Sequence, residues 1–547
     1  MGKLTVQNFV YKIHSNRLAK SKWNLTLPLD EARKNDEVVA MASSQMTRWI
    51  DELNGITGRD EEVISLKKAA KRVRKDQNTL ESRRKLKKIY SRLDELQFKP
   101  DLIIVVMDKV PHMRRAAKGF KLNGVSFVRL VATAGQVKTG GCMYVSERLA
   151  PELRCRIDNG RNPEVPLVPA KLEAYRALTC SSSHVVTFPR ITVVADCVTH
   201  FKEDTIFLDD AELEEPKMEF IKDAELELVE NDGYGLILPS MAEKWSQDLG
   251  LSYTPSCFNS RIAWGKGVLV QFDFLRWSDE VAGTRKIKDV WGHDVDLSDV
   301  DVIMSESQLK LWASYDSCED YLKCCNENHY EFSVTKYSPE ILDEMRGSNY
   351  QFLAPLDFSD DDIEELIAPS INSIRNIISQ SAGNASLFLH GPDVANMDPV
   401  DIPDDYAKAL MIEPRMMSDP YVMKRIHNLV QKRIQDLSIG VVDLYANFTI
   451  IAGDPVAFME SAHGMEVKGL LKPHEIYSSF WRKKEVGDVV CFRAPMSTLE
   501  NIVKMHVNDS DEAADWFQYI NNVTLMSSQS GECHSLNGAD ELCPTPR

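Results

Sequence analysis

The first hundred residues carry hydrophobic side chains at the spacing of amphipathic helices. Between residues 30 and 54 the apolar positions recur about every third or fourth residue, and Asn54-Gly55 then supplies a stop signal. A second stretch with the same spacing runs from about Glu61 to Leu96. We therefore predict a helical N-terminal region over residues 1–100 that includes a helical hairpin.

From Asp101 onwards the pattern changes to short apolar segments typical of β-strands. Strand patterns occupy residues 102–107, 125–131 and 191–195 and, as alternating positions, much of 204–236. Helical patterns separate them near residues 143–158 and 169–179. This alternation predicts a mixed α/β region over residues 101–230.

A charged stretch with few turn residues, 357–381, divides the rest of the chain. Its three consecutive carboxylates, Asp360, Asp361 and Asp362, fit the N-terminus of a helix, where negative charge interacts favourably with the helix dipole. We therefore predict a mainly helical connector over residues 346–437. It lies between one folded block at 231–345 and another at 438–547.

The amino-acid composition is typical of a folded protein without membrane spans. The chain has 547 residues, 43% hydrophobic and 27% charged, which predicts several packed units. Eleven cysteines without Cys-x-x-Cys spacing indicate reduced thiols. The apolar runs are far too short to span a bilayer, and residues 1–6 lack the features of an export or lipid-anchor signal. We expect a soluble cytoplasmic protein without a membrane partner.

The charge distribution is uneven. The net charge of −17 argues against a uniformly basic surface that coats nucleic acid, yet residues 67–92 hold twelve Lys or Arg and only two acids. One interpretation is a solvated face of the helical hairpin. The other is a nucleic-acid-binding arm that contacts phosphates through Lys85, Lys87 and Lys88, and the contrast with the acidic remainder favours it.

A lysine between two glycines marks the block at 231–345. Asp232-Gly233-Tyr234-Gly235 comes first, and Phe258, Arg261 and Gly265-Lys266-Gly267 follow. Glycines allow the backbone to approach a ligand closely, and an ammonium group can recognise phosphate as a point charge. The segment is not a Walker A loop, because Gly-x-x-x-x-Gly-Lys-Ser/Thr is absent. Alone, Gly-Lys-Gly is more typical of a surface turn.

The order of the motifs resembles that of the two-barrel RNA polymerases, which are built from double-psi β-barrels, and especially their cell-type RNA-dependent branch in bacteria and phages. In that family one barrel carries a Lys-Gly-Val-like strand and a later barrel carries an Asp-x-Asp-Gly-Asp loop. Here the first corresponds to Lys266-Gly267-Val268. The later barrel corresponds to Phe492-Arg493-Ala494-Pro495 and Asn537-Gly538-Ala539-Asp540, and the latter segment resembles the opening of the aspartate loop. Weaker similarities surround Gln136, Lys310 and Gly469.

The resemblance implies an α+β fold with two double-psi-like β-barrels, the first at 231–345 and the second at 438–547. It also implies two-metal chemistry, in which three carboxylates hold two Mg²⁺ ions. Asp540 would be a catalytic metal ligand, and Arg493 would lie near the primer end or the incoming nucleotide. Lys266 would offset charge on the phosphates. Arg261 and Lys310 would contact nucleic acid.

The sequence departs from the family at the aspartate loop. Leu542 and Pro544 stand where the second and third aspartates are required, and the chain stops at Arg547. We therefore expect the second barrel to be truncated and this copy to be inactive as it stands.

Three functions follow from these observations. The first is a template-directed RNA polymerase that uses nucleoside triphosphates and an RNA or DNA template. The alternative is a non-catalytic nucleic-acid-binding protein that uses the basic arm, and the third is a structural remnant without binding. Template type, primer use and oligomeric state stay open. Two weaker candidates are a zinc site and a thiol nucleophile, formed respectively by Cys318, Cys324, Cys325 and His329, and by Cys533 with His534.

Overall fold

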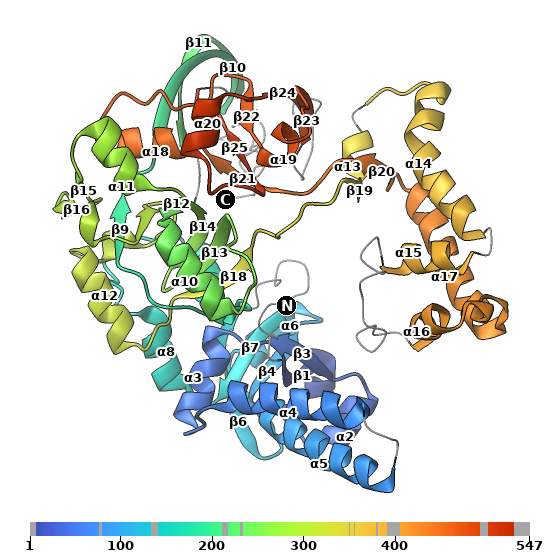
Figure 1. Ribbon diagram of the computed structural model, residues 1–547. Coiled ribbons are helices and arrows are strands. Elements are labelled where there is room, and N and C mark those ends of the chain that lie inside the picture. Colours follow the sequence, from blue (N-terminus) through green and yellow to red (C-terminus); the bar gives the residue numbers. More distant parts are fainter. Residues whose placement is uncertain are drawn as a thin grey trace. The chain divides into compact units, whose positions relative to one another are not determined.

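The computed structural model describes residues 7–75, 79–132, 141–209, 217–229, 233–348, 350–354, 356–378, 381–390, 405–492 and 502–529. The chain forms two compact units. Unit 1 comprises residues 1–340, 451–470 and 510–528, and unit 2 comprises 341–450, 471–509 and 529–547. Both units contain helices and strands, so the predicted α+β class is confirmed (Figure 1). The five sequence regions stay a prediction.

The N-terminal sheet of unit 1 has seven strands in the order β2-β5-β6-β7-β4-β1-β3. These strands are β1 (Gln7–His14), β2 (Asn24–Leu25), β3 (Val38–Ala42), β4 (Phe98–Val106), β5 (Phe120–Leu122), β6 (Val125–Ala132) and β7 (Gly141–Ser146). Strand β1 pairs in parallel with β4 and antiparallel with β3. The N-terminal region is therefore part of a sheet as well as helical.

Two helical predictions need correction at these strands. Residues 30–54 form α2 (Leu29–Lys34), β3 and α3 (Gln45–Leu53) rather than one helix, because β3 pairs with β1. Val38 and Val39 are β-branched and suit a strand, and tertiary pairing decides a short pattern that fits both periods. Likewise, only the second half of 143–158 is helical, as α8 (Ala150–Asp158).

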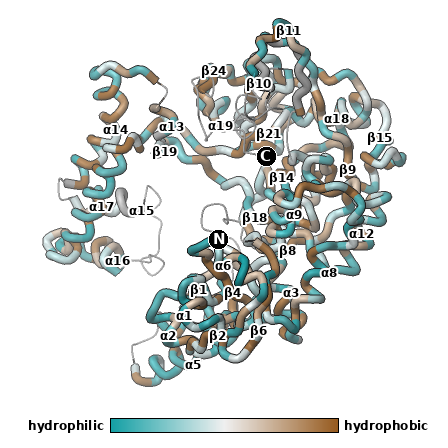
Figure 2. Tube along the Cα trace, turned by 180° about the vertical axis from the view of Figure 1, so that it is seen from behind, coloured by the Kyte–Doolittle hydropathy of each residue, from teal (hydrophilic) through white to brown (hydrophobic). Residues whose placement is uncertain are grey.

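The predicted helical hairpin is confirmed as α4 (Arg59–Lys75) and α5 (Leu80–Gln97). The two helices pack through Val63 and Leu93, which are both buried. Helix α5 begins with a capping box in which the Thr79 and Ser82 side chains each accept from the other's backbone N–H. Hydrophilic residues make up much of α5 (Figure 2). The short helices α1 (Ser15–Lys20) and α6 (Val110–Ala116) complete this region.

The second sheet of unit 1 also has seven strands, in the order β8-β18-β13-β14-β12-β17-β9. They are β8 (His184–Val185), β9 (Ile191–Val194), β12 (Tyr234–Ile237), β13 (Cys257–Ile262), β14 (Gly265–Gln271), β17 (Val302–Ser305) and β18 (Ser333–Tyr337). Strands β12 and β14 are parallel, as are β9 and β17, and the other neighbours are antiparallel. Trp245 of α10 (Pro239–Leu249) packs on Phe258 with ring centroids 5.3 Å apart.

Unit 1 also contains a long β-hairpin and several short helices and strands. Strands β10 and β11 form a long antiparallel hairpin. The elements are α9 (Pro169–Arg176), β10 (Val198–Asp209), β11 (Lys217–Val229), α11 (Phe274–Trp277), β15 (Lys286–Lys288), β16 (Asp294–Asp296), α12 (Cys318–Glu327), α18 (Pro455–Ala462), α20 (Asp511–Trp516), β25 (Val523–Met526) and most of β21 (Ile450–Gly453).

Unit 2 combines a helical part with a few strands. Helix α14 (Asp360–Ile378) begins with the three predicted aspartates in its first turn, which confirms that prediction. Strand β24 pairs in parallel with β22 and antiparallel with β23. The other elements are β19 (Met345–Gly347), α13 (Tyr350–Leu353), α15 (Ala382–His390), α16 (Asp405–Ile412), α17 (Pro420–Ser438), β20 (Asp443–Tyr445), β22 (Glu475–Tyr477), α19 (Ser479–Arg482), β23 (Asp488–Phe492) and β24 (Ile502–Val507). Among the described residues, no helix has the length and hydropathy to span a bilayer.

Candidate nucleic-acid interface

The hairpin of β13 and β14 places two predicted site residues side by side. Its register pairs Arg261 with Lys266, and Trp264 occupies the turn with φ of 58°. Directly opposed residues of antiparallel strands project from the same face, with Cβ atoms roughly 4.5–5.5 Å apart. Like charges in this arrangement repel each other. An anion near both side chains would relieve that repulsion.

Arg261 lacks an acidic partner among the described residues. Its side chain is partly buried, and Nη1 donates only to the carbonyl oxygen of Ser260, at 2.7 Å. The buried Nε has no hydrogen-bond partner in the described part of the chain. Burial lowers the pKa of this guanidinium. Desolvating a cation that has no carboxylate partner costs free energy, and a bound anion would offset that cost.

Lys310 reaches the turn of the same hairpin through its backbone. Its N–H donates to the carbonyl oxygen of Trp264 at 3.2 Å, and Leu309 forms a bridge with Gly265. The structure therefore brings three of the predicted residues, Arg261, Lys266 and Lys310, to one hairpin and the segment that crosses its turn. Lys266 is exposed and Lys310 is partly buried.

Gln308 fixes the position of the strand that carries Lys266. It is fully buried, its Nε2 donates to Ser260 Oγ at 3.2 Å, and its backbone carbonyl oxygen accepts from the Lys266 backbone N–H at 3.0 Å. A Cβ at Gly267 would lie 2.0 Å from the Gly233 carbonyl oxygen and 2.6 Å from Gln308 Cγ. The glycines thus allow close packing of β12, β14 and Gln308, rather than forming an open phosphate loop.

The stretch around Gly469 is a turn held by two buried acids. Asp454 Oδ2 accepts from the Leu470 N–H at 2.5 Å. Glu460 Oε2 accepts from the N–H groups of Lys468 and Gly469 at 2.6 and 2.8 Å. Gly469 has φ of 65°, and a Cβ there would lie 2.7 Å from Asp454 Oδ2. Both carboxylates are therefore engaged in holding the turn.

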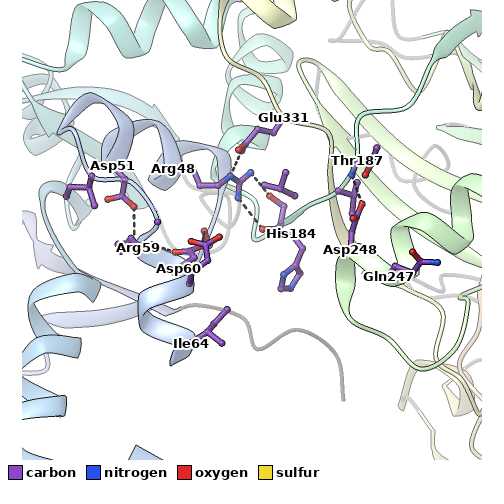
Figure 3. Close-up of a pocket in the computed structure, with 17 residues that line it drawn as sticks. Arg48, Asp51, Arg59, Asp60, Ile64, His184, Thr187, Gln247, Asp248 and Glu331 are labelled. Carbon is purple, nitrogen blue, oxygen red and sulfur yellow. Dashed lines mark hydrogen bonds and ion pairs between the residues drawn. The ribbon is translucent and has the colours of Figure 1, made fainter. Parts of the chain in front are cut away.

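A cavity of about 830 Å³ lies in unit 1 beside the helical hairpin (Figure 3). It is lined by both acidic and basic side chains, and its two arginines have carboxylate partners. Arg48 pairs with Glu331. Arg59 pairs with Asp51, at 3.0 Å from Nε to Oδ2, and with Asp60, at 2.8 Å. In contrast to Arg261, these cations are neutralised within the chain.

The basic arm is on the surface. Lys85, Lys87 and Lys88 are exposed on α5, and Lys85 forms an ion pair with Glu81 at 2.8 Å. Exposed pairs of this kind contribute at most about 1 kcal/mol to stability. The arm therefore presents its charge to solvent.

Sequence reasoning missed Asn259 and Lys336. The register of β13 with β18 pairs these two residues, and Lys336 is exposed. The alternation in Ser333-Val334-Thr335-Lys336-Tyr337 could have indicated the strand, but only the register shows which residues face each other.

Several predicted residues lie outside the described residues. They are Gln136, Arg493, Cys533, His534 and Asp540. The roles predicted for Arg493 and Asp540 and the state of the aspartate loop therefore stay predictions. Within the described ranges, no group of three or more His, Cys, Asp or Glu side chains is arranged to hold a metal ion.

Two of the three cysteines of α12 are core residues. Cys318 and Cys325 are buried, and burial raises the pKa of each thiol to about 12. Metal binding and nucleophilic attack both need the thiolate. The raised pKa of these two thiols disfavours both a zinc site and a nucleophilic role for them.

Comparison with known proteins identifies the family. Residues 77–514 match the model of the RNA dependent RNA polymerase family. The chain is 25% identical over 418 residues to the DNA-directed RNA polymerase YonO of Bacillus phage SPbeta, covering 73% of this chain and 46% of the relative. The RNA dependent RNA polymerase QDE-1 from Thielavia terrestris is similar at 15% identity with a TM-score of 0.49, over 80% of this chain and 47% of that one.

The chain spans about half the length of these two proteins. The family match covers the blocks around Lys266 and Arg493, two of the three on which the resemblance to double-psi barrel polymerases was based, and it ends before Asn537-Gly538-Ala539-Asp540. With a family model matching residues 77–514, the chain belongs to the RNA-dependent RNA polymerase family.

Proposed function

We propose that the chain acts in template-directed RNA synthesis, as a nucleotidyltransferase that takes nucleoside triphosphates and an RNA or DNA template. Family membership supports the reaction class. The named relatives differ in template, since one is described as DNA-directed and the other as RNA dependent. The template of this chain is therefore left as either nucleic acid.

The observation that carries this proposal is the Arg261–Lys266 pair. Two cations face each other on one sheet face, and the partly buried guanidinium of Arg261 has no carboxylate partner among the described residues. A guanidinium binds phosphate oxygens through two parallel N–H bonds, whereas an ammonium acts as a compact charge. In this arrangement Arg261 orients a phosphate, and Lys266 offsets negative charge that develops on it during transfer.

Magnesium belongs to the proposal through the family. Bound Mg²⁺ would activate the attacking 3′-hydroxyl and stabilise the leaving pyrophosphate. Asp540 would be one ligand, and Arg493 would lie near the reacting nucleotide. Both are outside the described residues, and the described residues hold no group of three or more His, Cys, Asp or Glu arranged to bind a metal ion. The steps assigned to this chain are therefore limited to phosphate binding and charge compensation by Arg261 and Lys266.

Nucleotide incorporation tests the proposal. The chain would be assayed with radiolabelled nucleotides and Mg²⁺ on single-stranded RNA and DNA, beside a variant with the family loop restored by Leu542→Asp, Cys543→Gly and Pro544→Asp. We expect the restored variant to incorporate more nucleotide, and Lys266→Met in that background to abolish the gain. Absence of incorporation by either protein on every template would overturn the proposal.

A second candidate is a non-catalytic nucleic-acid-binding protein. The exposed lysines on α5 favour it, because they present positive charge on a chain of net charge −17. It predicts salt-sensitive binding without any incorporation, even by the variant with the restored loop.

A further inference from the structure

One face of the second sheet carries polar and cationic residues across three neighbouring strands. We name as the cationic face Lys336 on β18, Asn259 and Arg261 on β13, and Lys266 on β14. The register pairs Asn259 with Lys336 and Arg261 with Lys266. Opposed residues share a face, as do residues two apart on a strand, so all four lie on the same side of the sheet.

The other side of the sheet is core. Phe258, Ser260 and Val334 are at most 1% exposed, and α10 packs there through the contact of Trp245 with Phe258. The ladder shifts register between Asn259 and Ser260, because Thr335 is an extra residue on β18. This bulge keeps Val334 in the core while turning Lys336 outwards.

Two of the three cations on this face lack a carboxylate partner among the described residues. Neither Lys336 nor Arg261 forms an ion pair within the described residues. Neighbouring strands are roughly 4.8 Å apart and residues two apart along a strand roughly 6.6 Å, so Lys336 lies diagonally from Arg261, on the far side of β13 from Lys266. Asn259 adds a buried Oδ1 that has no hydrogen-bond partner in the described part of the chain. Cations placed this close repel one another, and an anion that lies along them would relieve that repulsion.

We propose that Lys336, supported by Asn259, extends the Arg261–Lys266 site into a track for linked phosphates that runs across β14, β13 and β18. The inference rests on the proposed function and adds residues to the same site. A row across three strands suits consecutive phosphates better than a single phosphate. The linked phosphates can come from a nucleic-acid strand or from a nucleoside triphosphate, and direct binding separates these sources.

The test compares Lys336→Gln with Lys244→Gln in the full-length chain. Lys244 is an exposed lysine of α10, which packs against the opposite side of the sheet. Both changes remove one charge at an exposed position, so both variants should fold, which thermal melting would verify. Binding of a fluorescent 20-nucleotide single strand is measured by anisotropy over a series of salt concentrations, and binding of ATP is measured separately.

We expect Lys336→Gln to weaken oligonucleotide binding about three- to tenfold at low salt, and to reduce the slope of log affinity against log salt by about 0.7. Lys336→Arg should restore both. If Lys336→Gln weakens only ATP binding, the track holds a triphosphate instead of a strand, and the site itself stands.

Equal behaviour of Lys336→Gln and Lys244→Gln towards both ligands would overturn the inference while leaving the Arg261–Lys266 site intact. Failure of the unmodified chain to bind either ligand would instead count against the proposed function.

Discussion

The two seven-stranded sheets of unit 1 differ in whether a carboxylate neutralises their desolvated cations. Beside the N-terminal sheet, Arg59 and Lys99 are only 4% and 3% exposed, and both pair with Asp51. In the second sheet the guanidinium of Arg261 contacts a backbone carbonyl and lies opposite Lys266. Buried cations that serve the fold are neutralised by the chain itself. A cation without such a partner among the described residues is the kind of group that the proposed phosphate site would use.

The direction of the pKa shifts agrees with this contrast. Burial lowers the pKa of Lys99 to about 8, although Asp51 opposes that shift, and burial raises the pKa of Asp51. Each charge of this pair therefore depends on the other. For Arg261, desolvation alone lowers the pKa, and no carboxylate opposes it among the described residues.

Removing the carboxylate of Asp51, which Arg59 and Lys99 share, should produce the largest loss of stability. Asp51→Ala leaves Lys99 and Arg59 buried without their common partner, and breaking a buried pair in this way costs about 3–5 kcal/mol. Urea unfolding followed by tryptophan fluorescence would measure the loss. Asp299→Ala, at an exposed aspartate, is the control and should change stability by less than about 0.5 kcal/mol. Similar values for the two variants would remove the contrast between the sheets.

The second sheet should be sensitive to its backbone packing. Gly267→Ala places a methyl group 2.0 Å from the Gly233 carbonyl oxygen, so β12, β14 or Gln308 must move. Overpacking of this kind destabilises by about 1–3 kcal/mol. The control, Gly383→Ala in α15, has no close neighbour and should be neutral or slightly stabilising. A shift in the urea midpoint no larger than that of Gly383→Ala would contradict the close approach.

Neutralising Arg261 should not lower the free energy of unfolding, whereas neutralising Arg59 should lower it. Arg261→Met removes a desolvated charge that lacks a carboxylate partner among the described residues, so stability should stay constant or rise by about 1 kcal/mol. Oligonucleotide binding should nevertheless fall roughly 10- to 100-fold, as expected for the loss of hydrogen bonds from a charged group. Arg59→Met, with Asp51 and Asp60 left behind, should lower stability. Equal losses of stability would show that Arg261 is also a structural cation.

The sequence allowed better prediction of the candidate site residues than of their neighbours in the fold. Amphipathic spacing was sufficient for the α4–α5 hairpin, and Gly-Lys-Gly with the nearby Arg261 indicated the site. It was insufficient at Val38–Ala42, because a five-residue apolar segment fits both periods until a partner strand is known. Lys336 was missed because its neighbours depend on register and on a one-residue bulge, which are set by long-range pairing.

We expect the smallest effects on stability and binding from the basic arm, whose exposed lysines contrast with the partly buried Arg261 of the second sheet. Replacing Lys85, Lys87 and Lys88 together by Gln removes exposed charges, so stability should change by less than about 0.5 kcal/mol. If the arm contacts phosphates, gel-shift titration should show weaker binding at low salt and little difference at high salt, since exposed charges are screened. The control replaces Lys286, Lys288 and Lys323, which are also exposed. Identical behaviour of the two triple variants would assign the arm to a solvated helix face, and phosphate binding would then depend on the few cations held by the second sheet.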